Sequence, residues 1–158
     1  MTTAIVLAVA WGIAVAGCGA WLTDISPWYR SIRKPTWQPP DWLFGPAWTV
    51  ILGLASYSGY LAWRDAEGPA DRVQIAGLFG LNGLLNILWS PLFFRFRRPD
   101  LALIEVPFLW LSILALIVVL APISATASLL LVPYLAWVSF AAFLNLTIVR
   151  LNPPFAKH

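Results

Sequence analysis

Tryptophan and proline are concentrated in one short segment, residues 28–48, which reads WYRSIRKPTWQPPDWLFGPAW. It holds four of the ten tryptophans and four of the thirteen prolines of the chain, beside only four charged residues. Tryptophan offers a rigid aromatic surface with one N–H donor, and proline loses little conformational entropy when a segment becomes ordered. This combination predicts a built recognition site.

Conventional catalytic and metal-binding chemistry is not indicated by the other residues. The chain has one histidine, His158, one cysteine, Cys18, and one methionine, at position 1. The sequence therefore offers no internal histidine base, no disulfide, no cysteine-built metal site and no glycine-rich phosphate loop. Axial ligation of a haem iron by a histidine within the helices is excluded for the same reason. We interpret Cys18 as a small packing residue and predict no metal site and no tightly bound cofactor.

The composition determines which elements position this segment. Hydrophobic residues make up 60% of the chain and charged residues 11%, with a mean hydropathy of +0.78, which is typical of an integral membrane protein. A bilayer core about 30 Å thick takes about 20 helical residues. Five stretches have about that length, free of charge except for Glu105: residues 4–22, 42–63, 73–94, 101–121 and 126–149. We predict an all-α membrane protein with a single domain, residues 1–158: a five-transmembrane-helix bundle with a structured loop between its first two helices.

The charged residues between these helices predict the orientation in the membrane. Eight of the ten Lys and Arg fall on one side: Arg30, Arg33, Lys34, Arg95, Arg97, Arg98, Arg150 and Lys157. The other side holds only Arg64 and Arg72, among three acidic residues. Positively charged loops stay in the cytoplasm, so we predict an outside N-terminus and a cytoplasmic C-terminus. The net charge of +3 reflects this sidedness and does not favour nucleic-acid binding.

The third predicted helix carries a polar and aromatic stripe. Asn82, Asn86, Trp89 and Phe93 are spaced so that they share one helix face. Amides are costly in lipid, so this face should point into the bundle. Two roles stay open for the asparagines with equal weight: hydrogen bonds between helices, or contact with a ligand. A similar inward stripe on the fifth helix follows Pro133 and comprises Tyr134, Trp137, Ala141, Leu144 and Asn145.

Two further features of the helices allow several interpretations. Small residues recur every four positions on the first helix, at Ala4, Ala8, Gly12, Ala16 and Ala20. They permit close approach of another helix, either within the chain, which we favour, or in a homodimer. Glu105 lies about one turn into the fourth helix. Its open roles are pairing with a nearby arginine, forming a polar wall of a ligand cavity, and proton coupling.

Three separated blocks resemble one family of membrane proteins. The first is Trp28-Tyr29 followed by Lys34-Pro35-x-Trp37-x-Pro39-Pro40-x-Trp42-x-Phe44-x-Pro46-x-Trp48. The second is Asn86-x-x-Trp89-Ser90-Pro91-Leu92-Phe93-Phe94, and the third combines Pro133-Tyr134-x-x-Trp137, Leu144-Asn145 and Arg150-Leu151-Asn152. From about residue 28 to residue 152 the chain resembles the translocator protein or tryptophan-rich sensory protein (TspO/MBR) family.

The resemblance implies a membrane receptor or sensor that binds protoporphyrin, haem or related tetrapyrroles and regulates or traffics them. It also implies a cavity opening toward the first loop and a homodimer, and we expect the inner membrane of a bacterium. The positions that match the family's cavity are Tyr29, Trp37, Trp48, Asn82, Asn86, Trp89, Glu105, Trp137, Ala141 and Leu144. Arg30, Arg33 and Lys34 at the cytoplasmic mouth are either partners for ligand carboxylates or determinants of orientation alone, which we favour for each taken singly.

Two other activities stay open as alternatives. Some relatives degrade protoporphyrin in light, which for this chain implies Trp48 and Trp137 as the residues of a light- and oxygen-dependent enzyme. The other alternative is a tetrapyrrole or sterol carrier, although the chain shows no internal repeat of the kind found in inverted-repeat transporters. Leu52 and Leu146 replace tyrosines of many relatives, the second within a proposed cholesterol motif, which argues against sterol recognition by that route. The first loop is expected to cover the cavity as a lid; lying on the membrane surface is the alternative.

Overall fold

The structure, a computed structural model, describes residues 2–153, and every element in that range is helical. The elements are α1 (Thr2–Leu22), α2 (Pro27–Ser31), α3 (Asp41–Asp65), α4 (Pro69–Ser90), the π-helical turn η1 (Pro91–Arg95), α5 (Pro99–Leu120), α6 (Ala125–Leu129) and α7 (Val132–Leu151). Lys157 and His158, which enter the arguments above on orientation and on haem ligation, lie outside the described residues. The all-helical prediction is confirmed for the described part of the chain.

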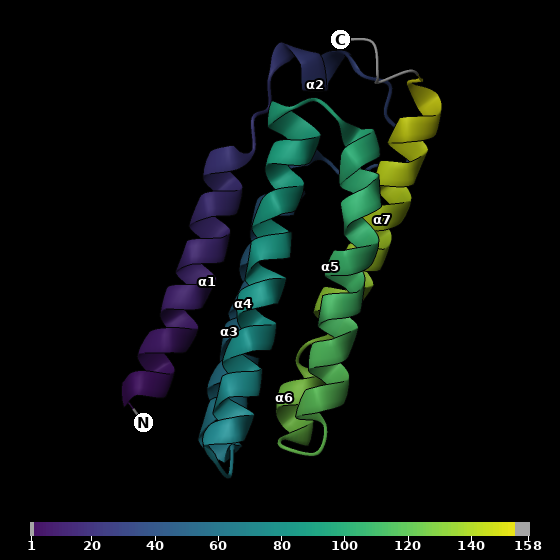
Figure 1. Cartoon of the computed structure of the whole chain (residues 1–158). Coiled ribbons are helices and arrows are strands. Elements are labelled where there is room, and N and C mark those ends of the chain that lie inside the picture. Colours follow the sequence, from purple (N-terminus) through teal and green to yellow (C-terminus); the bar gives the residue numbers. More distant parts are fainter. Residues whose placement is uncertain (1, 154–158) are drawn as a thin grey trace.

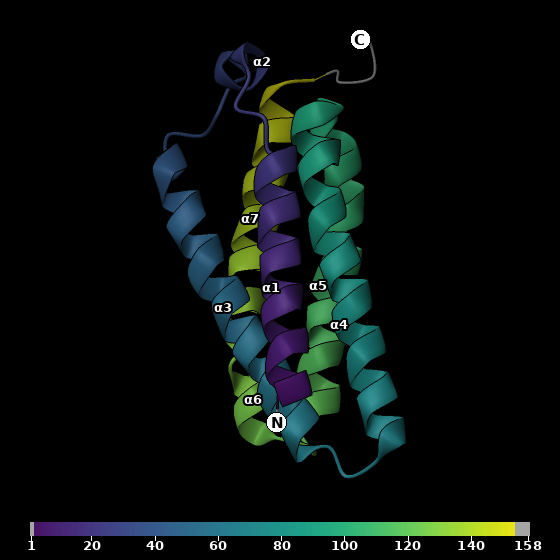
Figure 2. The ribbon, with the colours of Figure 1, turned by 90° about the vertical axis from the view of Figure 1, so that its left-hand side faces the viewer.

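The long helices run side by side along one axis, and the short α2 crosses one end of them (Figure 1). That end also holds the α4–α5 connection and the last residues of α7, whereas the N-terminus, the α3–α4 connection and α6 lie at the opposite end. Helix α1 packs on α3 and α4, and α5 packs on α4 and α7. Figure 2 shows that α3 leans away from α1 toward the α2 end.

Four helical segments are long and apolar enough to cross a membrane: Thr2–Leu22, Pro69–Arg95, Pro99–Leu120 and Ala125–Leu151. Many large apolar side chains on their outer faces are exposed, among them Val6, Ile13, Leu84 and Phe108, as expected where lipid rather than water covers the surface. Helix α3 has 25 residues, but its tryptophan, tyrosine, serine and glycine residues make it less apolar than these four. The count of five spans therefore stays a prediction.

Two predicted spans differ from the observed helices at prolines. The third was predicted to run to residue 94, but α4 ends at Ser90 and continues as η1, in which Phe96 N–H donates to Pro91 O over 2.8 Å. The fifth was predicted over residues 126–149, and one helical segment, Ala125–Leu151, covers that range, but a turn at residues 130–131 divides it into α6 and α7. Pro133 lacks the N–H that would continue α6 into α7.

Helix α1 joins the bundle through small residues and one tryptophan. A Cβ on Gly12 would collide with Ser56 Oγ of α3, so the ridge of small residues is used for packing within the chain at this point. On the side facing α4, Trp11 Nε1 donates to the carbonyl oxygen of Phe79 over 2.8 Å. A Cβ on Gly83 would lie 2.8 Å from the same indole nitrogen. The contact of Gly12 with Ser56 and that of Gly83 with Trp11 therefore both require glycine.

Candidate functional site

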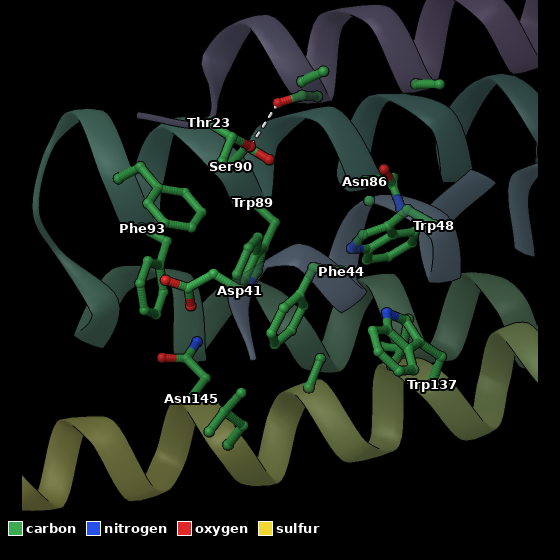
Figure 3. Close-up of a pocket in the computed structure, with 18 of the residues that line it drawn as sticks. Thr23, Asp41, Phe44, Trp48, Asn86, Trp89, Ser90, Phe93, Trp137 and Asn145 are labelled. Carbon is green, nitrogen blue, oxygen red and sulfur yellow. Dashed lines mark hydrogen bonds between the residues drawn. The ribbon is translucent and has the colours of Figure 1, made fainter. Parts of the chain in front are cut away.

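A cavity of about 790 Å³ lies in the half of the bundle next to α2, where α3 and α1 diverge. Its lining comes from α1, α2, the first loop, α3, α4, η1, α5 and α7. Aromatic and aliphatic side chains dominate, with a few polar groups between them (Figure 3). The volume lies within the range of about 300–1,000 Å³ that is usual for small-molecule sites.

Seven of the ten predicted site residues line this cavity: Tyr29, Trp48, Asn86, Trp89, Trp137, Ala141 and Leu144. The structure brings these residues together from four elements that are distant in the sequence. Trp37, Asn82 and Glu105 are not part of the lining. Asn82 hydrogen-bonds another helix, Trp37 packs on α7, and the buried Glu105 carboxyl has no hydrogen-bond partner among the described residues.

Aromatic rings form two groups along the cavity. Trp137 has its ring centroid 6.3 Å from that of Trp48 and 5.8 Å from that of Phe44, in edge-to-face arrangements. Closer to the first loop, Trp89 stacks on Phe93 at 5.0 Å with an angle of 25° between the ring planes. Figure 3 shows Phe44, Trp48 and Trp137 facing one another. The cavity can therefore hold an extended apolar ring system by contact with ring faces and edges.

Two of these tryptophans carry buried hydrogen-bond donors that no group within residues 2–153 satisfies. The indole Nε1 atoms of Trp89 and Trp137 are inaccessible to solvent and have no acceptor among the described residues. A buried N–H without a partner costs free energy, and such groups in a native fold call for an explanation. Both tryptophans line the cavity through other atoms of their rings, so a bound molecule would accept from either N–H only if the ring turned.

The asparagines of α4 belong to a hydrogen-bond network that joins three helices. Asn82 Nδ2 donates to Ser112 Oγ of α5 over 2.9 Å, and Tyr134 Oη of α7 donates to Asn82 Oδ1 over 3.2 Å. Asn86 Nδ2 donates to the same tyrosine oxygen over 2.8 Å. Asn82 is fully buried and acts between helices, whereas Asn86 also reaches the cavity. The interhelical role is thus seen for both asparagines, and contact with a ligand stays a prediction for Asn86.

Glu105 is buried in α5, and neither carboxyl oxygen has a hydrogen-bond partner among residues 2–153. Pairing with a nearby arginine, one of the predicted alternatives, is not formed, because Arg98 pairs with Asp100 at 2.6 Å instead. The residue lies outside the cavity lining, so it is not a wall of that cavity in this structure.

Trp37 lies in the first loop, residues 23–40, and packs on α7. Its ring stacks on Phe143 at 5.3 Å with an angle of 21° between the planes, and it meets Phe140 edge to face. The side chain is 43% exposed. Four residues earlier, Arg33 exchanges two backbone hydrogen bonds of 2.7 Å with the side-chain amide of Asn152. The loop is therefore held against the end of α7.

Tyr29 connects the loop to the start of α3. Its hydroxyl donates to Asp41 Oδ1 over 3.0 Å, and Gln38 Nε2 donates to both the Tyr29 oxygen and Asp41 Oδ1 over 3.2 Å. Burial, and next the hydrogen bond to Asp41, raise the pKa of Tyr29 from 10.0 to about 12. Neutral Tyr29 thus favours the loop conformation in which Tyr29 hydrogen-bonds to Asp41 at the start of α3.

This pKa shift predicts that the loop loosens in alkaline solution. Because the pKa of Tyr29 is higher in the folded loop than in a released one, its stabilising effect is complete below pH 10 and is lost as the pH rises toward about 12. Hydrogen exchange of loop amides, corrected for the intrinsic effect of pH, should show increasing opening over this interval. The Tyr29→Phe variant should lack that added dependence; an identical dependence in both proteins would contradict the prediction.

Several lining residues were not predicted from the sequence. The largest group is a stripe on α3 comprising Asp41, Phe44, Gly45, Trp48, Thr49 and Leu52, of which only Trp48 was singled out as a site residue. Their spacing of three and four residues is that of one helix face, so the signal was present. Gln38, Thr23 and the α1 residues Val15, Ala16, Gly17, Gly19 and Ala20 also contribute; of these, only Ala16 and Ala20 were marked by the sequence, and as packing residues.

The sequence profile of the TspO/MBR family matches residues 4–151. The chain belongs to the TspO/MBR family. It is 38% identical to the tryptophan-rich protein TspO of Chlorobaculum tepidum, with 97% of each chain covered. It is 40% identical to the protein of the same name from Archaeoglobus fulgidus over 89% of this chain and 91% of that one, and 34% identical to the translocator protein of Homo sapiens over 79% and 75%.

Family membership confirms the resemblance inferred from the three sequence blocks. It also confirms that the protein is integral to a membrane, together with the four long apolar helices. Each of the three blocks contributes residues to the cavity lining. The first contributes Tyr29 and Trp48, the second Trp89, and the third Trp137 and Leu144. Of the 26 residues named in the three blocks, 12 line this cavity.

Proposed function

We propose that the protein is a membrane receptor or sensor that binds protoporphyrin or a related tetrapyrrole in this cavity and regulates or traffics it. The observation that carries the proposal is a cavity of about 790 Å³ lined by aromatic rings, among them Trp48, Trp89 and Trp137. A tetrapyrrole offers a wide π surface that such rings contact by their faces and edges. Names such as translocator protein and tryptophan-rich sensory protein among the relatives agree with binding and sensing.

The residues present suit reversible binding of the ring itself better than axial ligation of a metal. No histidine, cysteine or methionine lines the described cavity, and these are the usual axial ligands of haem besides tyrosine. Tyr29, the one tyrosine in the lining, already donates its hydroxyl to Asp41. Metal-free protoporphyrin, or haem held by its ring, is therefore the proposed ligand rather than a resident cofactor.

The binding proposal is tested by titrating the detergent-purified protein with protoporphyrin in the dark and recording tryptophan fluorescence. Saturable quenching with one ligand per chain is expected, because Trp48, Trp89 and Trp137 line the cavity. Quenching that stays linear with concentration, or that is equal in a denatured control, would reject the proposal.

We further propose that the chain spans the membrane five times as a single domain, with α3 as the additional span. In support, the end that carries α2, the α4–α5 connection and the end of α7 holds seven of the nine described Lys and Arg residues, at 30, 33, 34, 95, 97, 98 and 150. By the positive-inside rule this end is cytoplasmic and the N-terminus is outside, in the inner membrane of a bacterium. The first loop then acts as a cytoplasmic lid, and the homodimer stays a prediction from the resemblance.

A second candidate function is light- and oxygen-dependent degradation of bound protoporphyrin. Trp48 and Trp137 favour it, because their rings adjoin at 6.3 Å and both line the cavity. If they take part, illumination in air should bleach bound protoporphyrin at least about tenfold more slowly in the Trp48→Phe, Trp137→Phe double variant at equal ligand occupancy. Bleaching at the unchanged rate would remove both residues from the mechanism. A carrier role would require accumulation of ligand in vesicles that contain the pure protein.

A further inference from the structure

The charge carried by the cavity lining is a feature that the proposed function does not use. Among all the lining residues that the structure describes, Asp41 is the single charged side chain. It stands in the first turn of α3 and is itself solvent-exposed, and Figure 3 shows its carboxylate on the side of the cavity where Phe93 and Asn145 lie. The lining therefore carries one negative charge and no positive charge.

The carboxylate is held in place by one of its two oxygens. Tyr29 Oη and Gln38 Nε2 both donate to Oδ1, over 3.0 and 3.2 Å. Oδ2 receives no hydrogen bond from residues 2–153, and none of the described Lys and Arg residues lies within ion-pair distance of Asp41. The start of a helix favours a negative charge at this position. One oxygen is thus fixed by the loop, and the other is free to meet a ligand.

The positive residues of the first loop form no ion pair with Asp41 in the described part of the chain. Arg30, Arg33 and Lys34 are all outside the cavity lining. Lys34 places its Nζ 3.9 Å from the centre of the Tyr29 ring, on a cation–π contact, and Arg33 is engaged through its backbone by Asn152. The cavity lining thus offers a ligand the Asp41 carboxylate and none of these three cations.

The charge is separated from the deeper aromatic residues by the length of two helical turns. Asp41 and Trp48 are seven residues apart on the same face of α3, which is about 10 Å at 1.5 Å per residue. A rigid ring system that contacts Trp48 and Trp137 can therefore place a substituent from its near edge beside Asp41. The charge of that substituent would then determine its interaction with the Asp41 carboxylate.

We propose that the Asp41 carboxylate selects, among flat aromatic ligands, those that present a cationic or hydrogen-bond-donating group at the loop end of the cavity, and disfavours those that present a carboxylate there. The inference rests on the proposed function and names the ligand class that the site prefers. Unmodified tetrapyrroles with two propionates are accepted only when those groups point past the loop toward the rim. Specificity of this kind depends on repulsion of the wrong ligand as much as on attraction of the right one.

The test compares two ligands that share one ring and differ in charge: protoporphyrin IX, with two propionates, and its bis-amide with ethylenediamine, with two ammonium groups. The readout is the ratio of their dissociation constants, acid over amide, for the protein in uncharged detergent at low salt. We expect the ratio to exceed 1 in the unaltered protein and to fall about tenfold in Asp41→Asn, which keeps the size of the side chain. Asp24→Asn removes an equal charge from an exposed loop residue outside the lining and should leave the ratio unchanged.

The outcomes separate this inference from the proposed function. Saturable binding of both ligands with the same ratio in Asp41→Asn and in the unaltered protein would overturn the role of Asp41 and leave tetrapyrrole binding intact. Absence of saturable binding of either ligand to the unaltered protein would overturn the proposed function and this inference with it. Where Asp41→Asn does not fold, Asp41→Ser carries the same expectation, because serine also suits the start of a helix.

Discussion

Protoporphyrin should bind the Trp137→Ala variant about 60-fold more weakly than the unaltered protein. A fully enclosed tryptophan buries about 200 Å², so one ring face against a ligand amounts to about 100 Å². At about 25 cal/mol per Å² this is worth about 2.5 kcal/mol, which corresponds to the stated change in Kd. The same substitution removes the buried Nε1 donor and the contacts of the ring with Phe44, Trp48 and Phe140.

Trp110→Ala is the matched control for this experiment. Trp110 is also a partly buried tryptophan, but its Nε1 donates to Ser139 Oγ over 2.9 Å and it lies outside the cavity. Its replacement should leave the Kd within about twofold, given that the protein stays folded. Equal losses of affinity in the two variants would indicate a general effect on the bundle and would contradict a specific role for Trp137. Equilibrium fluorescence and ligand absorbance together give both constants.

The second large effect concerns stability: Gly83→Leu should lower the free energy of unfolding by about 2–4 kcal/mol. A Cβ at this position would lie 2.8 Å from Trp11 Nε1 and 3.1 Å from Val15 Cγ2. The indole cannot move aside freely, because it donates to the Phe79 carbonyl. Overpacking costs about 1–3 kcal/mol and the lost hydrogen bond about 1 kcal/mol. Since Val15 lines the cavity, displacement of α1 should also weaken ligand binding.

Gly77→Leu provides the comparison for this stability measurement. Gly77 is on the same helix, so its replacement by leucine raises the helix propensity by the same amount. A Cβ at this position would have no atom within 4 Å. Thermal unfolding in detergent should therefore show a lower Tm for Gly83→Leu and an unchanged or higher Tm for Gly77→Leu. Two variants with the same Tm would show that α1 does not dock closely on α4.

The helices could be predicted from the sequence because each is an apolar run of about the length of a bilayer. Their interruptions could be predicted less well. Pro91 and Pro133 are both visible in the sequence, yet one is followed by a π-helical turn that keeps the helix nearly continuous and the other divides α6 from α7. Whether a proline bends, widens or breaks a helix depends on which neighbouring helices satisfy the freed carbonyl groups.

The site could be predicted in part, since helical spacing shows which face of a helix points inward. Asn82 and Asn86 are both on the inward face of α4, as predicted, but only Asn86 reaches the cavity. Spacing cannot show whether an inward residue meets another helix or an open space, because that depends on how far the helices diverge. The same reason explains the position of Glu105, and it explains why the shared face of Asp41 and Phe44 on α3 did not by itself show that the face borders a cavity.

The attachment of Arg33 to Asn152 has a consequence for how this protein can diverge over evolutionary time. Asn152 receives the N–H of residue 33 and donates to its carbonyl oxygen, so it contacts the main chain and not the guanidinium group. Any amino acid other than proline can make those two bonds. Residue 33 can therefore be exchanged freely during descent while the loop stays closed, so long as the asparagine is retained. Related proteins can in this way differ in the side chains that the loop exposes and still attach it to the end of α7 by the same two hydrogen bonds.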